Sequence, residues 1–196
     1  DMAIFCEGEA SFILQNICRQ MWINKKMLPV INQEQAREHF SKMQEQTLVR
    51  VRRNDWVKRK NEISVSYLEM FSHAQETITI MCSYFLPGRL FRRKLIQAVK
   101  RGVRVKVILA GTSDIAVAKH AERYLYDWML KNDIAIYEYQ ETVLHAKIAA
   151  CDGKWVTVGS YNVNNISAYA SLELNMDVKD AAFARYTEQE LQKIID

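Results

Sequence analysis

The sequence predicts an α/β fold, with one mixed, largely parallel sheet that is covered by helices on both faces. Two observations support this prediction. From residue 61 onward, β-branched apolar segments alternate with segments whose apolar residues recur at helical spacing, and this rhythm is typical of strands joined by covering helices. The chain of 196 residues is also 49% hydrophobic, which is sufficient for one well-packed core.

Each element is predicted from a local pattern. The stretch "ETITIMCSYF" at 76–85 has the composition of a strand and ends before Pro87-Gly88, and the helix that follows stops at Gly102. The expected order is helix 61–75, strand 76–85, helix 89–102, strand 103–111, helix 113–132, strand 134–139, a hairpin within 143–164, strand 170–178 and helix 180–195.

The first residues suggest that the chain contains parts of two domains. Residues 1–24 again have the pattern of a strand leading into a helix, and "EASF" at 9–12 echoes "DAAF" at 180–183. A match of four residues also arises by coincidence, so this echo is only weak support for a repeat. The expected segments are 1–26 as the terminal strand and helix of a preceding domain copy, 27–50 as a linker and 51–196 as the second domain.

Composition and charge limit the classes of function. The net charge is only +4, and the basic runs at 50–60 ("RVRRNDWVKRK") and 89–95 ("RLFRRKL") each favour a solvated helix face or a linker. No apolar stretch has the length of a membrane span, and the N-terminus lacks the pattern of a secretory signal. The four cysteines show neither metal-ligand spacing nor a disulfide framework, so we expect reduced, buried thiols.

The most informative stretch is "VLHAKIAACDGKWVTVGSYNVN", at residues 143–164. Asp152-Gly153 between two alternating apolar runs is a strong signal for a hairpin with a two-residue turn. Such a turn pairs Cys151 with Lys154 and fixes the register of both strands.

In this register four polar side chains share one face of the hairpin. Lys147 lies opposite Val158 and His145 lies opposite Ser160, while Asn162 follows on the same side. The neighbouring strand residues are apolar or small, and the hairpin supplies no carboxylate on this face. A desolvated ammonium is costly without an anionic partner.

An external anion explains this arrangement economically. An ammonium, an amide, a hydroxyl and an imidazole that titrates near neutral pH suit a phosphate group. The alternative is structural: His145 is a hydrogen-bonded core histidine, and Lys147 extends its ammonium to the edge of the sheet. That alternative holds for His39, His73 and His120, which lack such neighbours.

The spacing of these residues resembles a known signature. The pattern HxKxxxxD(x)6GSxN of the phospholipase D superfamily is matched by His145, Lys147, Asp152, Gly159, Ser160 and Asn162. The flanking stretches "ITIMCSYFLPGRLFRRKLIQAVKRGVRVKVILAGTSD" and "YEYQETVLHAKIAACDGKWVTVGSYNVN" resemble the second half of a bacterial cardiolipin synthase, and residues 1–24 resemble the end of its first half. The resemblance implies the αβα sandwich of that superfamily.

The resemblance also implies roles for individual residues. The family transfers phosphodiesters without a metal or other cofactor and uses two histidines, one from each motif copy. His145 is expected to be one of them, either as general acid and then base or as nucleophile. Glu173 matches the family's downstream acidic residue and would orient His145, although the family's frequent Asn two places earlier is Ser171 here. The implied phosphate ligands are Lys147, Ser160 and Asn162, and the implied structural residues are Asp152 and Gly159.

The resulting functional hypothesis is the C-terminal catalytic half of a cardiolipin synthase-like phosphatidyltransferase. Its expected partners are anionic phospholipids (phosphatidylglycerol and cardiolipin), a preceding domain copy or a second chain that completes the site, and the cytoplasmic face of the bacterial inner membrane. Arg89, Arg92 and Arg93 are basic residues that would suit a lipid surface. The alternative is a phospholipase D-type nuclease or a non-catalytic phosphate-binding module, because Trp56 lies among basic residues. The modest net charge makes nucleic acid the less favoured partner.

Overall fold

The computed structural model describes residues 1–21, 47–112 and 115–196, which contain one eight-stranded sheet flanked by helices. In space the strands follow the order β2-β1-β8-β7-β6-β3-β4-β5. The strands are β1 (Leu48–Asp55), β2 (Lys60–Asn61), β3 (Thr77–Cys82), β4 (Arg104–Ala110), β5 (Ile134–Tyr139), β6 (Lys147–Cys151), β7 (Trp155–Gly159) and β8 (Leu172–Lys179). The helices are α1 (Glu9–Met21), α3 (Glu62–His73), α4 (Arg89–Lys100), α5 (Ala116–Arg123), α6 (Tyr126–Lys131), α7 (Asn165–Tyr169) and α8 (Ala181–Ile195).

The sheet is mixed, and the predicted α/β class is confirmed. It is less parallel than expected, because only β3, β4 and β5 pair in parallel while the other neighbours in the described sheet pair antiparallel. The connections explain the difference. Helical crossovers join β3 to β4 and β4 to β5, whereas a tight turn joins β6 to β7 and reverses the chain.

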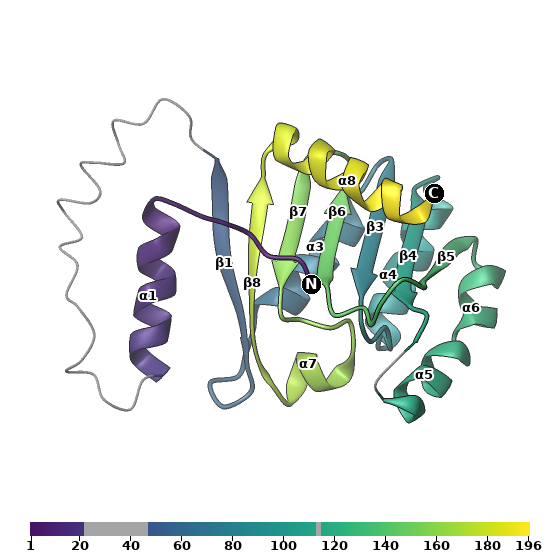
Figure 1. The fold of residues 1–196 in the computed structure, drawn as a ribbon, viewed down its shortest axis with the longest axis horizontal. Coiled ribbons are helices and arrows are strands. Elements are labelled where there is room, and N and C mark those ends of the chain that lie inside the picture. The colour runs from purple at the N-terminus through teal and green to yellow at the C-terminus, as the bar shows by residue number, and fades with distance from the viewer. Residues whose placement is uncertain (22–46, 113–114) are drawn as a thin grey trace.

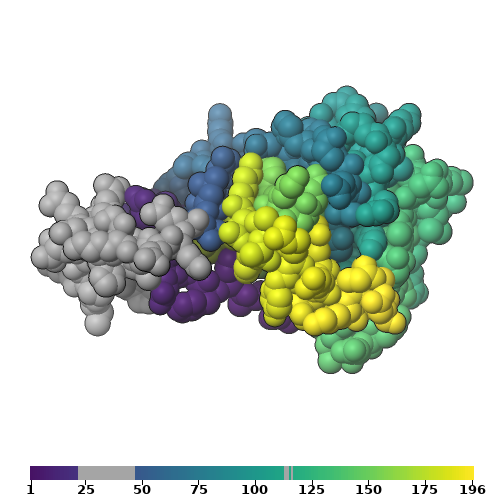
Figure 2. Space-filling model, turned by 90° about the horizontal axis from the view of Figure 1, so that it is seen from above, coloured from purple at the N-terminus to yellow at the C-terminus, as the bar shows by residue number. Residues whose placement is uncertain are grey.

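Helices cover both faces of the sheet, as predicted. In Figure 1, α8 crosses in front of the central strands, while α3 and α4 lie behind them. Figure 2 shows the same layers from above, with yellow α8 and part of the purple N-terminal segment on one side of the sheet and the blue and teal helices on the other. Met2 and Ile4 pack against the core beneath α8, so the N-terminal segment adds to that layer.

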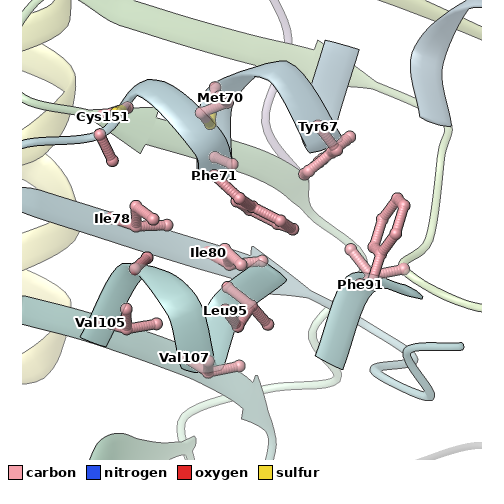
Figure 3. Close-up of a cluster of buried hydrophobic side chains, with 14 of the residues drawn as sticks. Tyr67, Met70, Phe71, Ile78, Ile80, Phe91, Leu95, Val105, Val107 and Cys151 are labelled. Carbon is pink, nitrogen blue, oxygen red and sulfur yellow. The ribbon is translucent and has the colours of Figure 1, made fainter. Parts of the chain in front are cut away.

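Alternation along the central strands builds a separate core on each face. Ile78 and Ile80 of β3 point toward α3 and α4, where Phe71 and Leu95 pack over them (Figure 3). Met81 points the other way, into the core beneath α8. Burying each such side chain contributes about 2 kcal/mol, so the period-two pattern fixes which side of the strand faces which helix.

The basic run at 50–60 is a strand and a hairpin, which corrects the expectation of a helix face or a linker. β1 pairs with β8 along its whole length, so residues 48–50 of the predicted linker 27–50 lie in the sheet, and 27–46 fall outside the described residues. Arg52 contacts the buried carboxylate of Asp177 on β8, with Nε and Oδ2 3.2 Å apart. This opposite-charge contact between neighbouring strands stabilises an arginine-rich strand. The second basic run, at 89–95, is part of α4.

Two further expectations were wrong. Residues 9–21 form the predicted helix, but residues 1–7 form no strand and pair with none of the described strands. The helix expected over 113–132 is divided into α5 and α6, and residues 113–114 fall outside the described part. The division occurs where the Leu125 N–H donates to the Glu122 carbonyl, three residues back, at 2.9 Å, because this tighter turn changes the direction of the chain.

Candidate phosphate-binding site

The predicted site residues lie at one edge of the sheet. β6 begins at Lys147 and its antiparallel neighbour β7 ends at Gly159. His145 precedes β6, and Ser160 and Asn162 follow β7, so all three belong to this edge. The C-terminal end of β3 reaches the same edge, which is where open α/β sheets place their ligands.

The predicted register of the hairpin was wrong by one residue. Cys151 pairs with Trp155 and Ile148 with Val158, because the loop contains three residues rather than two. Asp152 and Gly153 both have positive φ, 53° and 57°, and the Lys154 N–H donates to the Cys151 carbonyl at 3.0 Å. A shift of one residue exchanges the faces of a strand, so Ser160 does not lie opposite His145.

Lys147 is buried at the start of β6, with 6% of its surface exposed. Its Nζ donates to the Ser83 hydroxyl at 3.2 Å and to the His145 carbonyl at 2.7 Å. These two oxygens hold the ammonium at the sheet edge and replace part of the hydration that it loses on burial. Ser83 was missed by the sequence analysis, although its place directly after a predicted strand was a usable signal.

Asn162 is brought close to Lys147 by the segment that follows β3. The Tyr84 N–H donates to Oδ1 of Asn162 at 3.2 Å, and the Leu86 N–H donates to the Val163 carbonyl at 2.9 Å. Because Ser83 and Tyr84 are consecutive, the predicted ammonium and amide ligands of the phosphate are attached to the same short segment. The structure thus brings these two predicted residues together.

A buried charged cluster of Lys119, Glu122 and Glu138 holds the segment that follows β3. The Phe85 N–H donates to Oε1 of Glu122 at 3.0 Å. Lys119 lies 3.3 Å from Glu122 and 2.9 Å from Glu138. Burial raises the pKa of the Glu122 carboxyl. Although partial burial acts in the opposite direction, hydrogen bonds from Lys119 and Tyr126 lower the pKa of Glu138.

Ser160 and Glu173 form a second pair at the same edge. The Ser160 hydroxyl donates to Oε2 of Glu173 and accepts the Leu174 N–H at 3.0 Å. Oε1 of Glu173 accepts from Ser171 at 2.9 Å. Glu173 was expected to orient His145, but within the described residues no hydrogen bond joins the two side chains. The reason is topological, because Glu173 lies on β8 and β7 separates that strand from β6.

The carboxylate that contacts His145 belongs to Asp1 instead. Nδ1 of His145 lies 2.9 Å from Oδ1 of Asp1, and 65% of the histidine side chain is exposed. The contact occupies Nδ1 and leaves Nε2 as the ring nitrogen without this partner. No local pattern indicated Asp1, which lies 144 positions away in sequence.

The two remaining motif residues make backbone contacts. Oδ1 of Asp152 accepts the N–H groups of Glu76 and Thr77 at 2.8 and 2.9 Å, and Oδ2 accepts that of Gln75 at 2.8 Å. These donors lower the pKa of Asp152 although partial burial alone would raise it. A Cβ on Gly159 would lie 2.1 Å from the Leu174 carbonyl oxygen. Both observations support the structural roles expected for this aspartate and glycine.

The cysteines are only partly buried as a group. Cys82 and Cys151 are buried, and burial raises the pKa of each thiol to about 12. Cys6 is intermediate and Cys18 is exposed, so the expectation of buried thiols is correct for two positions.

None of the described helices is long and apolar enough to cross a bilayer.

Comparison with known sequences identifies the family. A family described as "Cardiolipin synthase, PLD-like domain" matches residues 67–195. The chain belongs to this family. Among curated relatives, cardiolipin synthase B of Shigella flexneri is 35% identical over 136 residues, which cover 69% of this chain and 33% of the relative. The chain therefore spans about a third of the length of that relative.

Solved structures show the same fold. A phospholipase D family member, Nuc from Salmonella typhimurium, superposes with a TM-score of 0.62 at 19% identity and covers 76% of this chain and 93% of its own. Phosphatidylserine synthase from Haemophilus influenzae Rd KW20 superposes with a TM-score of 0.71 at 13% identity, covering 96% of this chain and 53% of its own. The phospholipase D-like fold expected from the motif is thus confirmed.

Proposed function

We propose that this chain is the C-terminal catalytic half of a phosphatidyltransferase that makes cardiolipin from phosphatidylglycerol through a phosphohistidine intermediate. The observation that carries the proposal is the complete His-x-Lys and Gly-Ser-x-Asn set at one sheet edge, in a chain of the cardiolipin synthase family. With it we propose the domain division 1–26 for the end of a preceding copy, 27–50 for the linker and 51–196 for the second copy, whose start β1 extends to Leu48.

The geometry of His145 suits proton transfer. Its imidazole is exposed, and Asp1 contacts Nδ1, so Nε2 is the nitrogen that faces substrate. We assign Asp1 the orienting role that was expected of Glu173. Nε2 gives its proton to the leaving glycerol oxygen as the phosphorus–oxygen bond breaks, while the histidine of the preceding copy forms the phosphorus–nitrogen bond. Nε2 then accepts a proton from the hydroxyl of the second phosphatidylglycerol as that oxygen attacks phosphorus, and the phosphorus–nitrogen bond breaks, which releases the histidine of the preceding copy.

Lys147 and Asn162 stabilise the negative charge that develops on the phosphate oxygens. The charge on Lys147 and the amide donors of Asn162 favour the pentacoordinate state over the substrate, because negative charge accumulates on the oxygens there. Their shared attachment to Ser83 and Tyr84 limits reorganisation during the reaction. Ser160 assists from the neighbouring strand end.

One copy of the motif leaves the site incomplete. A preceding domain copy, or a second chain placed by two-fold symmetry, would supply the other histidine. We therefore expect a strictly monomeric sample of this chain to be inactive. The full-length protein would work at the cytoplasmic face of the bacterial inner membrane.

The proposal is tested with the longest native translation product that contains this chain. It is incubated with labelled phosphatidylglycerol in chelator, with His145→Ala as the control. Cardiolipin formed by the wild type and absent with the variant supports the proposal. A folded wild-type sample that forms neither cardiolipin nor phosphatidic acid contradicts the assigned substrate.

The second candidate is a phospholipase D-type nuclease or a phosphate-binding module for nucleic acid. Trp56 and the basic residues beside it in the β1–β2 hairpin are the observation in its favour. Cleavage or salt-sensitive binding of DNA by the same sample, without lipid turnover, would select this candidate.

A further inference from the structure

Large apolar side chains are exposed on two segments next to the predicted site. In the β1–β2 hairpin, Trp56 and Val57 are 58% and 67% exposed. In α7, Ile166 and Tyr169 are 69% and 71% exposed. Such side chains gain nothing from folding, and a group of them marks an interaction surface. We call these four residues, together with Lys58 and Arg59, the hairpin–α7 surface.

A hydrogen bond joins the hairpin to α7. Nδ2 of Asn54, near the end of β1, donates to the Ser167 carbonyl at 3.3 Å. The Ser167 side chain is buried, whereas Ile166 and Tyr169 are three positions apart and share the outer side of the helix. Both segments lie along the lower edge of the sheet in Figure 1. The four apolar side chains therefore belong to one edge of the molecule.

This surface borders the phosphate-binding site. Asn54 is the ladder partner of Glu173, and Asp55, the last residue of β1, is that of Leu172, so the hairpin loop begins two residues beyond the partner of the site carboxylate. On the other side, the Asn162 N–H donates to the Ser167 hydroxyl at 3.3 Å. The hairpin–α7 surface thus adjoins the polar residues that are proposed to hold a phosphodiester.

The charge of the surface indicates its partner. Lys58 and Arg59 are exposed at the hairpin tip, and neither forms an ion pair with the rest of the described chain. The loop has a defined shape, since the Lys58 N–H donates to Oδ1 of Asp55 at 2.9 Å. A tryptophan beside lysine and arginine is typical of the boundary between water and lipid, where anionic headgroups attract basic residues.

We propose that the hairpin–α7 surface docks on a bilayer that contains anionic phospholipid. The inference deepens the proposed function and rests on it, because docking there presents a lipid phosphodiester to the site. Trp56, Val57, Ile166 and Tyr169 enter the headgroup region, and Lys58 and Arg59 contact its phosphates. Nucleic acid would use the two charges but would gain nothing from Val57 or Ile166.

The test uses the whole 196-residue chain and vesicles of phosphatidylcholine with or without phosphatidylglycerol. Co-sedimentation is compared for the wild type, for Val57→Ser with Ile166→Ser, and for Leu48→Ser with Tyr186→Ser. The last pair is a matched control, with exposed fractions of 55% and 61% at the far end of β1 and on α8. All four side chains are largely exposed, so the fold tolerates their replacement.

We expect the first double variant to lower vesicle binding about tenfold or more, with the control unchanged. Lys58→Gln and Arg59→Gln should each lower binding to phosphatidylglycerol vesicles about fivefold. As a second measurement, vesicles should shift the tryptophan emission of the wild type to shorter wavelength, and the shift should be reduced in Trp56→Phe. Equal binding by wild type and the first double variant overturns the proposal, as does an equal loss in the control pair.

Loss of DNA binding in the charge variants, with vesicle binding unaffected by the apolar ones, would also overturn it and assign the surface to nucleic acid. Failure of docking is distinguishable from failure of the proposed function. Turnover is measured separately with the longest native translation product that contains this chain, on phosphatidylglycerol dispersed in detergent micelles, where docking on a bilayer is not required.

Discussion

At one end of the β6–β7 hairpin the imidazole of His145 is exposed and is contacted by a single carboxylate, whereas at the other end the carboxylate of Asp152 accepts three backbone N–H groups. Both residues belong to one sequence signature. The site end leaves the imidazole accessible, and the turn end uses its side chain to attach the hairpin to the start of β3. On the proposed assignment, one signature therefore contains a residue for chemistry and a residue for folding, separated by the length of a strand.

The largest expected effect is on activity at the site end. His145→Ala should lower metal-independent lipid turnover by about a thousandfold or more, because both proton transfers are assigned to this imidazole. The free energy of unfolding should change by less than about 0.5 kcal/mol, since the side chain is exposed. Turnover of the longest native translation product in chelator measures the first effect, and urea unfolding of this chain measures the second. His73→Ala is the control, and wild-type turnover by the His145 variant would remove the residue from the site.

Gly159→Ala should lower stability at the site end, where the other changes are expected to act on activity. It therefore tests how strictly the two ends differ. Its Cβ would lie 2.1 Å from the Leu174 carbonyl oxygen and 2.6 Å from Cα of Asn175, so backbone atoms must move. We expect a loss of about 3 kcal/mol in urea unfolding. In Gly88→Ala the nearest atom is a side-chain oxygen at 3.0 Å, and the loss should be under about 1 kcal/mol. Equal stability of the two variants would contradict the packing argument.

Asp152→Ala sharpens the comparison at the turn end. Losing the acceptor of three N–H groups should cost about 2 kcal/mol at neutral pH without lowering turnover per folded molecule. Because the pKa of Asp152 is lowered from 3.8 in the fold, its stabilisation is present above that value and is lost as the pH falls through the folded pKa.

The pH dependence is the discriminating measurement for Asp152. The difference in unfolding free energy between wild type and Asp152→Ala should shrink below about pH 4. Asp152→Asn keeps one acceptor oxygen and should lose about half as much stability at neutral pH. A difference that stays constant into strong acid would show that the carboxylate charge is not the cause.

The smallest effect is expected at Ser160. Ser160→Ala removes a hydroxyl that contacts both Glu173 and the Leu174 N–H, for a cost of about 1 kcal/mol, or about fivefold in turnover. Ser171→Ala removes the other hydroxyl on Glu173 and is the matched control. Equal turnover in the two variants would indicate that Ser160 acts through the carboxylate and does not bind phosphate.

Elements with a local signature were predictable from the sequence. The strand expected at 134–139 matches β5, Ile134–Tyr139, and the helix expected at 89–102 matches α4, Arg89–Lys100, because periodicity and stop residues are properties of neighbouring positions. The strand β1 was missed, since its arginines have no strand signature until Arg52 meets Asp177, 125 positions away.

By itself, the sequence determined the α/β class, the family, and the placement of His145, Lys147 and Asn162 around one hairpin. Only the tertiary structure decided the hairpin register, the contact between His145 and Asp1, and the pairing of Ser160 with Glu173. The reason is physical. Periodicity and turn residues act over a few positions, whereas these contacts depend on strand order and on how Asp152 binds to the start of β3, which no local pattern encodes.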